Sequence, residues 1–74
     1  MEDKLRATFA EALGTTADQI TDTTTYSEFP NWDSVAHMAL IAAIEESFDI
    51  MIDAEDVIDM SNFAKAKQIV AKYL

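Results

Sequence analysis

The chain has 74 residues, a formal net charge of −9 and no cysteine. This length allows one small domain spanning residues 1–74, and the lack of cysteine excludes disulfides and thiolate metal sites. The acidic balance argues against nucleic-acid binding, because phosphate contacts need cations. An acidic start and the lack of any run near the ~20 apolar residues that cross a bilayer predict a soluble, cytoplasmic protein without a membrane span.

The charge is unevenly distributed along the chain. Two cations lie within the first six residues and three within the last ten, and nearly all the acids lie between them. A negative surface of this kind favours partners with basic patches, which its field can steer in. A solvated acidic exterior kept for solubility explains the same pattern equally well.

The first predicted element is an amphipathic helix ended by Gly14. Its apolar stripe consists of Leu5, Phe9, Ala12 and Leu13. A long connection follows from Thr15 to Asn31, without sustained periodicity and with a short turn near residues 17–20. Four apolar or aromatic residues are expected to fold this loop back onto the core: Ile20, Tyr26, Phe29 and Trp32.

The central helix is predicted from Val35 to Phe48, where alanine, leucine and methionine favour helix. Either Asp33 or Ser34 suits its N-cap. Both side chains can accept a hydrogen bond from the first turn, so the sequence alone does not decide which of the two residues caps the helix.

Two shorter helices complete the chain. The stretch Ile50 to Met60 predicts a short third helix, with Asp53 as its cap and Asp56 in the place of a capping-box carboxylate. Ser61 or Asn62 caps the last helix, which turns an apolar stripe inward. That stripe consists of Phe63, Ala66, Ile69, Val70 and Tyr73. Four helices without strand-like alternation predict an all-α four-helix bundle with a long first loop.

Asp33, Ser34 and His37 include the residue types of a hydrolytic triad. A spacing of three residues allows Ser34 and His37 to face the same side of a helix start. A bundle of this size leaves little room for the oxyanion site and closed pocket that such a triad needs. We therefore expect no catalytic residue, and a His37 that faces solvent or a partner.

The acids of "DIMIDAEDVID" suggest a calcium loop, but their spacing does not fit one. Counting from Asp49 places Met51 at the third position, where an oxygen ligand is needed, and Ala54 at the sixth, where a glycine is needed. One histidine without cysteine also excludes an ordinary structural zinc site. We expect no metal site.

Ser34 suits a covalently held phosphate. A hydroxyl at a helix start is exposed, and an attached phosphodiester would meet unpaired backbone N–H groups and the positive end of the helix dipole. Serine is also among the commonest N-caps, so capping explains the residue as well.

The stretch "DSVAHMALIAAIEESFDI" resembles the central helix of acyl carrier proteins, whose signature is Asp-Ser-Leu followed by an apolar helix ending in Leu-Glu-Glu-x-Phe. Asp33 and Ser34 match the first two residues, and Val35 replaces the leucine. The helix end matches at Ile44, Glu45, Glu46 and Phe48. The surrounding segments agree in order and length, so the resemblance covers essentially the whole chain.

The resemblance implies a discrete carrier protein that is not an enzyme. Ser34, with Asp33 as its motif partner, would receive 4′-phosphopantetheine from coenzyme A through a magnesium-requiring phosphopantetheinyl transferase. The terminal thiol of this covalent cofactor would hold acyl or aminoacyl groups as thioesters for loading and transferring enzymes. The pathway would be fatty-acid-like, polyketide, peptide or otherwise specialised, and we expect a monomer.

The departures from the family pattern concern partner contacts. Fatty-acid carriers usually place acids where this chain has Ala36 and Ala39, so we expect partners with apolar or basic docking patches. The predicted partner interface consists of Val35, Ala36, His37, Met38, Ala39, Glu45, Glu46 and Asp56. Alanines that simply allow close helix packing are the alternative.

The motif Trp-Asp-Ser followed by histidine looks like that of stand-alone carriers of specialised pathways, although Trp32 equally suits a core anchor for the loop. Two alternatives remain open. One is a small acidic helical interaction module that is never modified. The other is a carrier-derived protein that keeps the fold with an unmodified Ser34.

Overall fold

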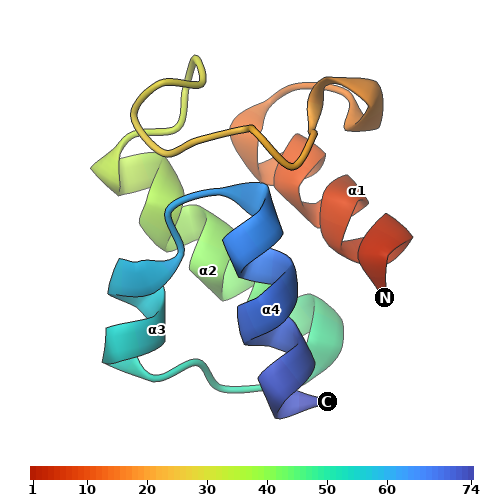
Figure 1. The fold of residues 1–74 in the computed structure, drawn as a ribbon, viewed down its shortest axis with the longest axis vertical. Helices are drawn as coiled ribbons and strands as arrows, with labels where there is room; N and C mark the ends of the chain where they lie inside the picture. The colour runs from red at the N-terminus through yellow and green to blue at the C-terminus, as the bar shows by residue number, and fades with distance from the viewer.

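The computed structural model describes residues 1–74 and contains four α-helices and one short 3₁₀ helix. The elements are α1 (Glu2–Leu13), η1 (Ala17–Gln19), α2 (Ser34–Phe48), α3 (Ala54–Asp59) and α4 (Phe63–Tyr73). In Figure 1, α1 and α3 lie on opposite sides of α4, and α1 packs against α2. The predicted all-α bundle with a long first loop and a short third helix is confirmed.

Local chemistry fixes the ends of the helices as expected. Gly14 ends α1 in the left-handed region at a φ of 69°, which glycine adopts without a steric penalty. Asn62 caps α4, because its Oδ1 accepts a hydrogen bond from the Lys65 N–H at 2.7 Å. Of the two residues proposed for that cap, Asn62 is therefore the one used.

The short third helix begins directly after Asp53, the residue predicted as its cap. It covers six residues, and the preceding segment from Ile50 to Asp53 is not helical. The Ile52 N–H instead donates to Glu45 Oε2 at 2.9 Å, which holds this segment against α2. Asp53 is the N-cap residue, but its side chain accepts no capping hydrogen bond, so the predicted capping box with Asp56 is wrong.

The core is built around three aromatic rings. Phe9 contacts Trp32 and Phe63 edge to face, with ring centroids 5.4 Å and 5.0 Å apart. Trp32 is only 1% exposed, so the loop residue is a core anchor. Such edge-to-face pairs add about 0.5–1.5 kcal/mol each beyond the area that they bury.

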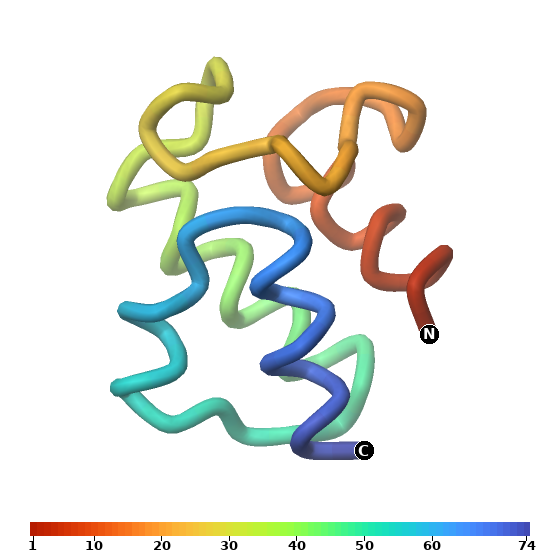
Figure 2. Tube along the Cα trace, viewed as in Figure 1, coloured from red at the N-terminus to blue at the C-terminus, as the bar shows by residue number.

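The long loop folds back onto the bundle, as predicted. Ile20 is buried, and Tyr26 and Phe29 are partly buried against the core. A β-bridge joins Thr25 to Asn62, and Figure 2 shows this part of the loop running alongside the start of α4.

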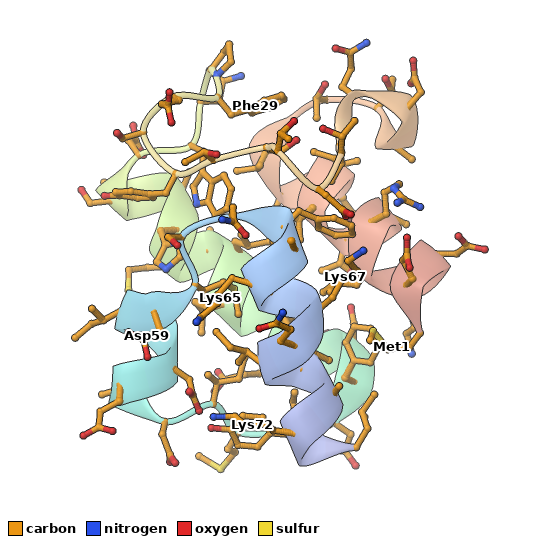
Figure 3. The ribbon with its side chains drawn as sticks, in the orientation of Figure 1. Met1, Phe29, Asp59, Lys65, Lys67 and Lys72 are labelled. Atoms are coloured by element: carbon orange, nitrogen blue, oxygen red, sulfur yellow. The ribbon has the colours of Figure 1, made fainter.

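Charged and backbone contacts add to this attachment. The Tyr26 N–H donates to the Ser61 carbonyl at 2.8 Å. Lys67 Nζ lies 2.7 Å from Asp22 Oδ1, and Figure 3 shows Lys67 on the side of α4 that faces α1. The start of α2 is thus held by a loop that is itself fixed at several points.

The two chain termini lie together on one side of the molecule, away from the start of α2 (Figure 1). None of the helices is both long enough and apolar enough to cross a membrane.

Candidate functional site

Ser34 is the first residue of α2, and its side chain is exposed. The neighbouring Asp33 caps the helix, since its Oδ1 accepts a hydrogen bond from the Ala36 N–H at 2.9 Å. The Asp33 carbonyl also accepts from the His37 N–H at 2.8 Å. The Ser34 hydroxyl makes no hydrogen bond within the protein, so it is free to be modified.

His37 lies in a different environment from the predicted one. Trp32 Nε1–H donates to His37 Nδ1 at 2.9 Å, and this leaves the ring proton on Nε2. Nε2–H then donates to the Val57 carbonyl at 2.8 Å. The half-buried ring is therefore bound within the bundle at both nitrogens, whereas the expectation was a His37 that faces solvent or a partner. Because both nitrogens have partners, His37 is not available as a base for Ser34.

A cavity of about 390 Å³ opens beside Ser34. Its walls come from the loop, α2, α3 and the segment before α4: Tyr26, Ser34, His37, Met38, Val57, Ile58, Met60 and Ser61. This volume falls within the usual range for small-molecule sites, which is about 300–1,000 Å³. Two larger hollows, of about 760 and 490 Å³, are bordered by α1 and do not include Ser34.

The surface beside Ser34 is apolar. Val35 is 79% exposed and Met38 is 60% exposed, and Ala39 is exposed on the same helix. Ile58 of α3, which the sequence analysis did not place at the site, is 80% exposed. The one feature of the sequence that could have indicated Ile58 is that it is an apolar residue in a short acidic helix. We call Val35, Met38, Ala39 and Ile58 the apolar face.

Asp56 does not belong to an exposed interface. It is 8% exposed, and its carboxylate accepts hydrogen bonds from Lys72 Nζ at 2.7 Å and from the Tyr73 hydroxyl. The hydrogen bond from Lys72, with a second from Tyr73, holds the pKa of Asp56 below its ordinary value. Figure 3 shows Lys72 reaching from α4 toward α3. Sequence proximity could not reveal this contact, because the partners lie 16 and 17 residues apart.

The remaining predicted interface residues differ in exposure. Ala36 is half-buried and packs against the core. Glu45 is half-buried and one of its carboxylate oxygens holds the Ile52 N–H, whereas Glu46 is exposed. The structure thus brings Ser34 together with the apolar face and places Glu46 further along α2.

A four-helix domain with a free serine hydroxyl at the start of its central helix has the form of a carrier domain. The model of the family described as "Phosphopantetheine attachment site" matches residues 3–70. The chain is also 31% identical over 74 residues to "Acyl carrier protein" of Buchnera aphidicola subsp. Baizongia pistaciae (strain Bp), covering 100% of this chain and 95% of that relative.

The chain therefore belongs to the acyl carrier protein family. Members of this family are carriers and not enzymes, and they hold 4′-phosphopantetheine as a covalently attached prosthetic group. A carrier of this type interacts with transferases and with acyl-handling enzymes.

Proposed function

We propose that Ser34 is the attachment point of 4′-phosphopantetheine and that the chain is a discrete acyl or aminoacyl carrier protein. The observation that carries this proposal is that Asp33, and not Ser34, caps the start of α2. Asp33 makes the capping hydrogen bond, and the hydroxyl of Ser34 is left exposed and unbonded. A serine needed for the cap would not be free for a transferase to reach.

The surroundings of Ser34 fit the group. The first N–H groups of α2, at Ser34 and Val35, have no intrahelical acceptor, and together with the positive end of the dipole they favour a phosphodiester on this hydroxyl. The neighbouring cavity offers apolar side chains to the rest of the arm. When attached, the arm supplies a terminal thiol that holds acyl or aminoacyl groups as thioesters.

The proposed docking surface is the apolar face, with the carboxylate of Glu46 further along α2. Exposed apolar side chains next to a modified residue favour partner enzymes that recognise shape and apolar contact. A basic group on the partner would meet the carboxylate of Glu46, which lies beyond the apolar face along α2. Among the predicted interface residues, Ala36, His37 and Asp56 are engaged within the bundle and are not part of this proposal. A cytoplasmic location and a monomeric state belong to the proposal as well.

Mass spectrometry of the intact protein tests the attachment. The protein is incubated with coenzyme A, magnesium and a broad-specificity phosphopantetheinyl transferase, and we expect a mass gain of one phosphopantetheine group. Ser34→Ala should abolish the gain. Ser61→Ala is the matched control, because Ser61 is an exposed serine that lines the same cavity, and it should be modified like the wild type.

Two results would overturn the proposal. A mass gain that survives Ser34→Ala would move the attachment to another residue. No gain with several transferases would favour the unmodified interaction module or the carrier-derived protein. The interaction module additionally predicts partner binding that is indifferent to Ser34→Ala.

A further inference from the structure

The short helix α3 is held at two separate points. Near its start, the Asp53 N–H donates to the Tyr73 hydroxyl at 3.1 Å, and Asp56 accepts from Lys72 and Tyr73 of α4. On its other side, the Val57 carbonyl accepts the hydrogen bond from His37 of α2. Six residues are too few to form a stable helix alone, so the position of α3 depends on these contacts.

Apolar burial is concentrated at the two ends of α3, where Ile52 and Met60 belong to the core, and little of it lies within the helix itself. Asp56, which is paired with α4, is the one buried residue of this helix. Val57 is half-buried, and Ile58 is 80% exposed. The hydrogen bond from His37 therefore has a larger share in the position of α3 than a single bond has in a well-packed helix.

His37 is the middle member of a chain of hydrogen bonds. Trp32 Nε1–H donates to Nδ1 at 2.9 Å, and Nε2–H donates to the Val57 carbonyl at 2.8 Å. Trp32 is fixed in the core, and the two rings stack at 5.9 Å with an interplanar angle of 22°. Only the ring with its proton on Nε2 serves both bonds, because a proton on Nδ1 would place two donors face to face.

The cavity beside Ser34 lies along this chain of bonds. Ser34, His37 and Met38 of α2 form one wall, and Val57 and Ile58 of α3 belong to the opposite wall. His37 thus lines the cavity and also binds the backbone of the facing wall. The separation of α2 and α3 next to Ser34 is therefore set by this side chain.

We propose that His37 is a positioning residue that latches α3 against α2 and so fixes the width of the cavity beside Ser34. When the latch is released, α3 remains attached to α4 through Asp56 and moves away from α2 about that end. The cavity then widens next to Ser34. Its use by the arm or its cargo rests on the proposed function, but the latch itself is a property of the unmodified protein.

Amide hydrogen exchange followed by NMR on the unmodified protein tests the latch. His37→Phe keeps an aromatic ring and removes both hydrogen bonds, whereas the amide of His37→Gln can still accept and donate one bond each. Loss of a bond of ordinary net strength should speed exchange of the Val57 and Met60 amides of this segment by roughly 2- to 13-fold in His37→Phe. We expect His37→Gln to recover most of this protection.

Two references separate the latch from general destabilisation. Amides of α1 should accelerate at least several-fold less than those of Val57 and Met60. Tyr26→Phe is the matched control, since the Tyr26 ring lies 5.3 Å from His37 while its hydroxyl makes no hydrogen bond. It should leave α3 protected. Equal acceleration of α1 and α3 in His37→Phe, or no acceleration of α3, would overturn the proposal.

The wild-type ring gives a second test that needs no variant to fold. Ring ¹⁵N chemical shifts should report a neutral His37 with its proton on Nε2, and the opposite tautomer would overturn the latch. Ser34→Ala should leave all of these readings unchanged. Failure of the attachment and failure of the latch are thus distinguishable.

Discussion

Replacing Asp33 and Ser34 one at a time by alanine should separate helix capping from attachment. Asp33→Ala removes the side-chain oxygen that accepts from the Ala36 N–H at 2.9 Å. Loss of such a cap typically costs about 1 kcal/mol, which lowers the Tm of a domain of this size by about 4–8 °C. Ser34→Ala removes an exposed hydroxyl without a protein partner, so we expect a change within about 0.5 kcal/mol.

Urea unfolding of the unmodified proteins, followed by far-UV circular dichroism, measures both effects. The midpoint should fall for Asp33→Ala with an unchanged m-value, and it should hardly move for Ser34→Ala. Asp33→Asn is the matched control, because asparagine caps a helix about as well as aspartate. If Ser34→Ala destabilised the protein as much as Asp33→Ala, the serine would be the cap, and the observation that carries the attachment proposal would be lost.

Three further predictions concern the bundle. Circular dichroism should show Trp32→Ala largely unfolded at 25 °C. Truncating a buried Trp costs about 3–5 kcal/mol, which is as much stability as a core of this size usually supplies. A cooperative thermal transition near that of the wild type would contradict this. In Asp56→Asn, the free energy of unfolding should fall less steeply on acidification than in the wild type. The lowered pKa of Asp56 stabilises the fold above the pKa of an unfolded carboxyl, about 3.9, and this stability is lost as the pH falls through the pKa of the folded state. Urea midpoints at several pH values check this, and Asp59→Asn, at an exposed acid of the same helix, should keep the wild-type slope. Gly14→Ala should lower the free energy of unfolding in urea by about 1 kcal/mol, and Gly14→Asn should lower it less. The reason is that the left-handed φ of 69°, and not a clash with a neighbouring atom, sets the penalty. Equal losses in the two variants would refute this explanation.

The helices that the sequence predicts well are those with local signals. The left-handed Gly14 ends α1, and Asn62 and Asp33 carry side chains that cap α4 and α2 through bonds to residues three positions away. Each of these contacts is decided within one turn of chain. The amphipathic stripe of α4 needed only its own periodicity.

The features that the sequence did not predict depend on contacts between distant segments. Asp56 reads as a capping carboxylate until Lys72 and Tyr73 are folded against it. His37 reads as an exposed residue until α3 brings the Val57 carbonyl to its ring. In both cases the polar group is satisfied by a partner on another element, and single-sequence patterns do not report such pairings.

The candidate site also combines residues that local sequence signals indicate with one that only a contact between distant segments brings in. Ser34 could be proposed from the sequence because its motif and its place at a helix start are local. The apolar face was partly foreseen, because Val35, Met38 and Ala39 were among the predicted interface residues. Its fourth member, Ile58, comes from α3 and lines the same cavity as Met38 only in the folded chain.

The placement of the termini has a practical consequence. Both ends of the chain lie on the side of the bundle away from the start of α2 (Figure 1). Polypeptide joined to either end would extend away from Ser34 and the apolar face. A surface tether or a fused protein at either end would therefore leave the start of α2 accessible to other molecules.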